Sequence, residues 1–299
     1  MSRPTAPRST AGGAVHDGPA TSPRLPGAVP WALTGAAVLV QIVYPLLPAS
    51  AAASATVASV LVFCAASVGD AARVHGLRGA AVLLTVAGGG GLLVEAVGVH
   101  TGLPFGTYAY TGDLGPTVLG VPLVVPLAWT MMAWPALVVG RTLAQRWPVA
   151  PVALVGGAAL AAWDLFLDPQ MVDAGYWTWA HPAPALPLVP GVPVTNYAGW
   201  LLVAVVMVGL LDGALPRTAV PHGTGPSGPA AALYLWAYGS SVLAHVAFFD
   251  RPGAALVGGI GMGALALPFA RAVWSAAAPS ALAAVRRRPS ARPAPDQSA

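Results

Sequence analysis

Three carboxylic acids lie in or beside strongly apolar segments of this 299-residue chain. Glu95, the one glutamate in the sequence, stands in LLVEAVGVH, and Asp164 and Asp168 stand in AAWDLFLDP. An ionisable side chain inside a bilayer is energetically costly unless it is paired, neutralised or directed at a polar cavity. Three such residues therefore indicate a functional site within a membrane protein.

The spacing of the two aspartates suits proton chemistry. Asp164 and Asp168 are four residues apart, so on a helix their carboxyl groups lie on one face, roughly 6 Å apart. Such a pair can share one proton, and burial in a low-dielectric environment further favours the neutral acid. One member of the pair then donates a proton, while the other, or Glu95, orients a water molecule. A structural role in helix pairing or capping remains the alternative for the pair.

The elements that must position these acids are membrane helices. Hydrophobic residues make up 56% of the chain and charged residues 8%, against roughly 25% charged residues in a soluble domain. Long apolar runs recur throughout and predict an all-α polytopic membrane protein with about eight transmembrane helices. The predicted spans are 29–47, 51–69, 79–99, 120–140, 149–167, 197–211, 230–249 and 254–271. We expect the sixth to begin earlier, inside the preceding loop.

The charge distribution predicts the topology. All fourteen basic residues are arginines, and thirteen fall on the cytoplasmic side if the N-terminus is cytoplasmic; Arg251 is the exception. The positive-inside rule then places both termini in the cytoplasm and the protein, multi-pass, in the cell membrane. Residues 29–272 form the predicted helical domain, and 1–28 and 273–299 are predicted disordered tails. The net charge of +4 is consistent with basic tails that contact anionic membrane lipid. It therefore does not indicate nucleic acid as a partner.

Several cofactor sites are excluded by residue usage. Cys64 is the single cysteine, so a thiolate metal site is not expected. The six histidines are scattered and lack the close helical spacing that a zinc or di-iron site needs. The Gly88–Gly91 run lies inside a predicted membrane helix, which favours close helix packing over a dinucleotide loop. The sequence thus predicts no metal and no cofactor.

Two long connections without basic residues carry further signals. They occupy 102–135 and 163–200 and combine Gly and Pro breakers with Tyr, Trp and a carboxylate. The predicted topology places both on the outer face. Non-helical backbone at membrane depth is tolerated only where it is buried in protein or lines a cavity. A lidded pocket open to the bilayer fits this pattern, and ordinary interfacial loops with an aromatic belt are the alternative.

The ordered motifs of these connections resemble a known family. The chain is similar over roughly residues 30–270 to the carotenoid biosynthesis membrane protein family, which includes bisanhydrobacterioruberin hydratase and the γ-carotene 1′,2′-hydratases. The residues that carry the resemblance are Gly102-Leu103-Pro104-Phe105-Gly106, Tyr108, Tyr110, Leu114-Gly115-Pro116, Gly120-Val121-Pro122, Trp129, Asp164, Asp168-Pro169, Trp177, Trp179, Gly191-Val192-Pro193, Asn196, Gly199 and Trp200. Tyr197 departs from the pattern, since phenylalanine is more usual there.

The resemblance implies a hydro-lyase that adds water across the terminal C1=C2 double bond of an acyclic carotenoid, with other enzymes of the carotenoid pathway as partners. The chemistry needs a proton donor at C2, stabilisation of a tertiary cation at C1, and a held water. The candidate catalytic residues are Asp164, Asp168 and Glu95. Asn196 is a candidate ligand of the water or the product hydroxyl, or else a cap of the sixth helix.

Aromatic side chains would bind the polyene and attract the developing cation. The candidate substrate-binding aromatics are Tyr108, Tyr110, Trp129, Trp163, Trp177, Trp179 and Trp200. A membrane belt or simple packing is the alternative role for each of them.

Other functions fit parts of the pattern. A membrane prenyltransferase also uses spaced aspartates, but its diphosphate substrate needs Arg or Lys, which these loops lack. A proton-coupled transporter would also bury carboxylates, yet the inverted repeats expected of it are not evident. An isomerase or cyclase that acts on the same end group through the same cation stays open.

Overall fold

A computed structural model describes residues 27–145, 151–217 and 228–286, with side chains described as far as residue 276. Seven helical runs within these ranges are long and apolar enough to cross a membrane. In lipid, a helix satisfies all of its own backbone hydrogen bonds, which is why such apolar runs become helices. The prediction of an all-α polytopic membrane protein is confirmed. The two predicted disordered tails fall largely on residues outside the described ranges and stay predictions there.

The helices follow the predicted spans closely. They are α1 (Ala28–Val43), α2 (Ala52–Leu83), α3 (Gly90–Thr101), α4 (Val124–Ala144), α5 (Val152–Asp173), α6 (Val194–Ala214), α7 (Gly228–Ala247) and α8 (Pro252–Arg286), with the short turns η1 (Tyr44–Leu46) and η2 (Ala49–Ala51) and the π-helical segment η3 (Leu84–Gly89). Helix α6 begins before residue 197, as expected. Helix α5 continues beyond the predicted end at 167, so Asp168 is helical, and α8 continues well beyond the predicted end at 271.

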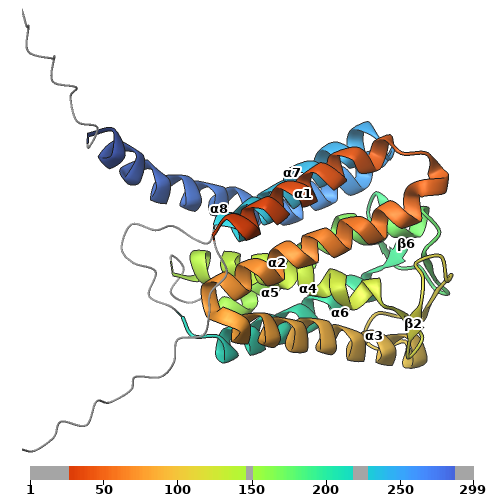
Figure 1. Ribbon diagram of the computed structural model, residues 1–299. Helices are drawn as coiled ribbons and strands as arrows, with labels where there is room; N and C mark the ends of the chain where they lie inside the picture. Colours follow the sequence, from red (N-terminus) through yellow and green to blue (C-terminus); the bar gives the residue numbers. More distant parts are fainter. Residues whose placement is uncertain (1–26, 146–150, 218–227, 287–299) are drawn as a thin grey trace, which may run out of the picture.

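The second helical run folds back on itself. Residues Ala49–Thr101 form one 53-residue run, but Gly76 adopts a left-handed conformation with φ 69°, which glycine reaches at little steric cost. Figure 1 shows α2 and α3 running in opposite directions on either side of this turn. The described chain starts and finishes at the same end of the bundle. Eight spans and cytoplasmic termini stay predictions.

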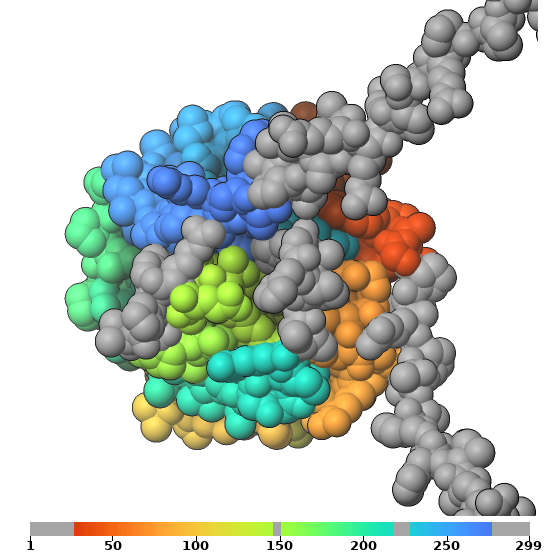
Figure 2. Space-filling model, turned by 90° about the vertical axis from the view of Figure 1, so that its left-hand side faces the viewer, coloured from red at the N-terminus to blue at the C-terminus, as the bar shows by residue number. Residues whose placement is uncertain are grey.

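Helices α4 and α5 form the centre of the bundle. In the most apolar stretch of each helix, 83% of the α4 residues and 67% of the α5 residues are buried, whereas in α1 the share is 17%. Figure 2 shows the adjoining ends of α4 and α5, in yellow-green, among the ends of the other helices. Gly140 of α4 and Gly156 of α5 meet backbone to backbone, since a Cβ on Gly140 would lie 2.9 Å from the Gly156 Cα. Small residues permit this approach.

The other end of the bundle is closed by short strands, and we call it the loop end (Figure 1). Three antiparallel two-stranded sheets form there: β1 (Tyr108–Tyr110) with β4 (Trp177–Trp179), β2 (Thr117–Val118) with β3 (Val121–Pro122), and β5 (Ala185–Leu186) with β6 (Val189–Pro193). The sequence indicated irregular loops at these positions, so the strands were not predicted. The β1–β4 pair joins the two connections at 102–135 and 163–200, which we call the two aromatic connections.

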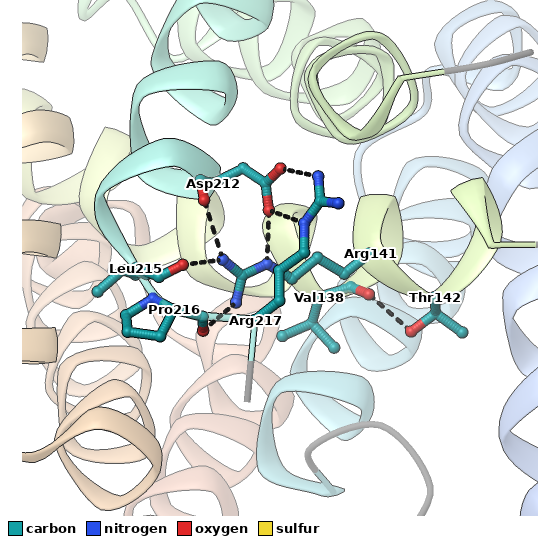
Figure 3. Close-up of polar contacts among 7 residues, drawn as sticks. All are labelled: Val138, Arg141, Thr142, Asp212, Leu215, Pro216 and Arg217. Atoms are coloured by element: carbon teal, nitrogen blue, oxygen red, sulfur yellow. Dashed lines mark hydrogen bonds and ion pairs between the residues drawn. The ribbon is translucent and has the colours of Figure 1, made fainter. Parts of the chain in front are cut away.

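An arginine cluster ties α4 to α6 at the end opposite the loop end (Figure 3). Arg141 Nε donates to Asp212 Oδ1 at 2.8 Å, and its Nη2 donates to the Leu215 carbonyl at 2.7 Å. Arg217 Nη2 reaches Asp212 Oδ2 at 2.5 Å. The last carbonyls of a helix lack partners within the helix, and Arg141 supplies one. The cluster therefore terminates α6 and fixes it to α4.

Candidate functional site

A large cavity lies at the loop end, and it brings the predicted site residues together. Its empty space, including the open mouth, is about 1340 Å³. Ten of the eleven predicted site residues line it: Glu95, Tyr108, Tyr110, Trp129, Trp163, Asp168, Trp177, Trp179, Asn196 and Trp200. The eleventh, Asp164, is fully buried behind Asp168 and hydrogen-bonded to Asn196.

Glu95 of α3 is held by three neutral donors. Its Oε1 accepts from Trp129 Nε1 at 2.9 Å, and its Oε2 accepts from the hydroxyls of Tyr108 at 2.5 Å and Tyr110 at 2.8 Å. The side chain is 5% exposed. These three contacts fix the orientation of the carboxyl group. Glu95 has no cationic partner among the described residues.

The two tyrosines that hold Glu95 are matched to that task. Burial raises the pKa of the Tyr108 hydroxyl and of the Tyr110 hydroxyl, and the nearby Glu95 carboxylate raises each further. A phenol whose anionic form is disfavoured in this way keeps its proton. Both hydroxyls therefore stay donors to Glu95 over the physiological pH range.

The aspartate pair of α5 is organised by one amide from α6. Asn196 Nδ2 donates to Asp164 Oδ2 at 3.0 Å and also to Asp168 Oδ2. The other oxygen of Asp164, Oδ1, is buried without a hydrogen-bond partner among the described residues. Trp177 Nε1 donates to Asp168 Oδ1 at 3.0 Å. One amide thus holds the two carboxyl groups together beside the cavity.

The role of Asn196 is now clearer than the sequence allowed. Helix α6 begins at Val194, with Pro193 as its N-cap residue and no side-chain cap. The helix-cap alternative for Asn196 is therefore wrong. Asn196 is the third residue of α6, and its amide donates to the two aspartates instead.

The β1–β4 sheet connects the two acidic groups. Tyr108 pairs with Trp179, and Tyr110 pairs with Trp177. Alternation along the strands exposes Ala109 and Thr178 while the four aromatic side chains point inward. One strand thus carries donors to Glu95, and the other carries the Trp177 donor to Asp168. The aromatic side chains of the sheet thus cover Glu95 and Asp168.

Stacked indoles form part of the cavity wall. The rings of Trp129 and Trp200 lie 3.9 Å apart and nearly parallel, and Trp163 contacts Trp200 edge to face at 6.3 Å. Gly91 gives Trp129 its place, since a Cβ there would lie 3.0 Å from the indole. The prediction of close packing at the glycine run is confirmed at Gly91, and at Gly88, where a Cβ would meet the Thr130 hydroxyl at 3.0 Å.

Sequence reasoning missed two sets of residues. A fourth carboxylate, Asp70 of α2, is fully buried near the end of the bundle that lies opposite the loop end. It accepts from Trp134 Nε1 at 2.9 Å. Uncharged polar side chains also line part of the cavity, among them Gln41 and Ser240. Gln41 interrupts an apolar run in the first predicted span, which was an available signal for a polar wall.

Comparison with known proteins identifies the class to which this fold and site belong. Residues 51–265 match the carotenoid biosynthesis protein family. The match covers more than half of the chain, so this protein belongs to that family. The region includes both halves of the acid site but leaves out α1 and η1, which contribute Gln41 and Tyr44 to the cavity wall.

One curated relative has a named activity. The chain is 38% identical over 130 residues to bisanhydrobacterioruberin hydratase of Haloarcula japonica, and the alignment covers 42% of this chain and 43% of that protein. The chain thus matches less than half the length of this relative. No solved structure matches the chain.

Proposed function

We propose that this protein hydrates the terminal C1=C2 double bond of an acyclic carotenoid end group. The observation that carries the proposal is the meeting, around one aromatic cavity, of two aspartates joined by a common amide donor and of Glu95, which has no cationic partner among the described residues. Membership of the carotenoid biosynthesis family and the name of the relative support it. The cell membrane is the proposed location.

Asp168 is the proposed acid. It lines the cavity, whereas Asp164 lies behind it. The π electrons of the alkene form the new C2–H bond with the Asp168 proton, which leaves a tertiary cation at C1. Before the transfer Asp164 and Asp168 share this one proton, and Asn196 holds the two groups in register. A positioned general acid contributes about 10²–10⁴-fold to a rate.

Glu95 is the proposed base. Its carboxylate attracts the cation electrostatically, and the faces of Trp129, Trp200 and the two tyrosines add cation–π attraction of about 0.5–2 kcal/mol each. Water then bonds to C1 and gives a proton to Glu95. Return of this proton to the aspartate pair completes the cycle, so alkene and water become a tertiary alcohol without net change in the protein.

The decisive experiment is expression in a lycopene-producing bacterium followed by mass analysis of the pigments. A gain of one water per reacted end supports hydration. Pigments of unchanged mass but altered end groups would replace hydration by isomerisation or cyclisation, and unaltered pigments would count against chemistry on this substrate.

The proposed reaction is redox-neutral, so its requirements are simple. Activity in isolated membranes should persist without oxygen or NAD(P)H and in the presence of a metal chelator. Strict dependence on oxygen would replace the hydratase by a hydroxylase.

A further inference from the structure

A row of uncharged polar side chains runs along one wall of the cavity. The row consists of Gln41 and Tyr44 of the first helix and its turn, Thr56 and Ser59 of α2, and Ser240 and Ser241 of α7; all six line the cavity. We call it the neutral polar row. None of the six is charged, whereas the acid site contains three carboxylates.

Hydrogen bonds link four members of the row in two pairs. Gln41 Nε2 donates to Ser59 Oγ at 3.1 Å, and Gln41 Oε1 accepts from Trp236 Nε1 at 2.7 Å. Thr56 Oγ1 donates to the Tyr44 hydroxyl at 3.2 Å. In the described part of the chain, the hydroxyls of Ser240 and Ser241 face the cavity without a hydrogen-bond partner.

The row lies in the same cavity as the acid site and reaches the loop end. Tyr44 begins the connection between α1 and α2 at that end, and its hydroxyl lies 3.5 Å from Gln170 Nε2 of α5. Gln170 is two residues from Asp168, and both line the cavity.

The chemistry of the row does not match a polyene. A polyene offers no hydrogen-bond donor or acceptor, and a polar group left without a partner costs about 1–3 kcal/mol. Water satisfies hydroxyl and amide groups in any orientation. Most of the remaining lining is apolar or aromatic, which suits the hydrocarbon. The cavity therefore has one wall for water and another for the polyene.

We propose that the neutral polar row is a hydrated channel that carries water from the loop end to the acid site. The inference rests on the proposed function, since hydration consumes one water in each turnover. It assigns a role to residues on α1 and α7, which do not themselves carry any of the three acids. Ser59 stands seven residues into α2, so the channel extends roughly 10 Å below the start of that helix.

Cysteine accessibility tests the channel directly. Ser59→Cys and Ser240→Cys are made in a Cys64→Ala background, and permeabilised membranes are treated with a sulfonate-bearing methanethiosulfonate, which reaches both membrane faces. The matched controls are Leu61→Cys on α2 and Leu243→Cys on α7, where the native leucines are 48% and 61% exposed on the outside of the bundle. Since the thiolate is the reactive species, a cysteine against lipid reacts slowly.

We expect both row positions to react at least about tenfold faster than their leucine controls, because a hydrated thiol ionises and a lipid-facing one does not. Adding Thr56→Val should slow labelling at Ser59→Cys several-fold, because it removes a hydroxyl from the neutral polar row. Rates at the row positions equal to those of the controls would show that the row is dry and would overturn the proposal.

Labelling and turnover are separable in this design. The pigment assay is run on the same membranes. A dry row with normal hydration would reject the channel and keep the proposed function, whereas a reactive row without any hydrated pigment would keep the channel and reject the function.

Discussion

Buried carboxylates at the two ends of the bundle have different partners. At the loop end, Glu95 and the aspartate pair are held by phenol, indole and amide groups alone. At the opposite end, Asp70 pairs with Arg73 at 2.9 Å, and Asp212 pairs with Arg141 at 2.8 Å. Asp70 is buried and Asp212 partly buried, and arginines pair with both. In the described ranges, the arginine pair at the loop end joins Arg251 to the exposed Asp173 and not to the three acids of the site.

One helix shows the contrast most directly. Helix α4 supplies Trp129 to Glu95 and Trp134 to Asp70, and both indole N–H groups donate at 2.9 Å. The difference lies in the second partner, which is a pair of tyrosines for Glu95 and Arg73 for Asp70. An arginine fixes a carboxylate as an anion, whereas neutral donors leave it able to exchange a proton. Burial alone therefore does not mark the reactive acids.

The largest effect is expected from the aspartate pair. Asp168→Asn removes the acid next to the cavity and should lower hydration per folded protein by about 10²–10⁴-fold. Asp164→Asn should also abolish measurable product, because the shared proton is lost. Hydrated pigment is measured against the amount of protein in the membrane. Normal turnover by Asp168→Asn would remove that residue from the mechanism.

Asp70→Asn is the matched control at the opposite end. It also removes a buried negative charge, but it leaves the cavity intact. We expect less folded protein, since Arg73 loses its anionic partner, with hydration per folded protein retained. A loss of turnover as deep as that of Asp168→Asn would erase the proposed difference between the two ends.

A second effect concerns the orientation of Glu95. Tyr108→Phe and Tyr110→Phe each remove one hydrogen bond to Oε2, and each should lower turnover by roughly 10- to 100-fold, because a hydrogen bond to a charged group is worth about 1.5–3 kcal/mol. The double variant should approach the loss caused by Glu95→Gln. Initial rates in isolated membranes provide the measurement, and unchanged rates in the double variant would contradict the orienting role.

A third effect concerns stability at the opposite end. Arg141→Gln removes the ion pair to Asp212 and the bond to the Leu215 carbonyl, which should lower the melting temperature in detergent by several degrees. Turnover per folded protein should hold, because the cluster lies far along α4 from Trp129. Thermal unfolding followed by intrinsic fluorescence, alongside the pigment assay, separates the two quantities.

The smallest effect is expected at Arg217. Its side chain is 68% exposed, and exposed ion pairs contribute about 0–1 kcal/mol. Arg217→Ala should therefore change the melting temperature much less than Arg141→Gln. An equal loss for both variants would show that Asp212 depends on Arg217 as strongly as on Arg141.

The sequence predicted the helices and the members of the site better than it predicted their arrangement. Apolar run lengths located the helices, and the costs of burying Glu95, Asp164 and Asp168 identified the acids. The strands escaped detection because segments of two to five residues rich in Gly, Pro and aromatics carry too short a pattern. Asp70 escaped detection because its burial depends on the turn at Gly76 and on packing against α4, which are properties of the assembled bundle.

The register between β1 and β4 has a consequence for how this family can diversify. Side chains alternate between the two faces of a strand, so a one-residue slip would exchange Tyr108 and Tyr110 for their neighbours and turn the aromatic rings outward. A single insertion or deletion between Thr107 and Thr111 would thus detach Glu95 from its donors. Chimeras that exchange the two aromatic connections between relatives should transfer them as a matched pair, and length changes should be accepted more readily beyond the paired residues.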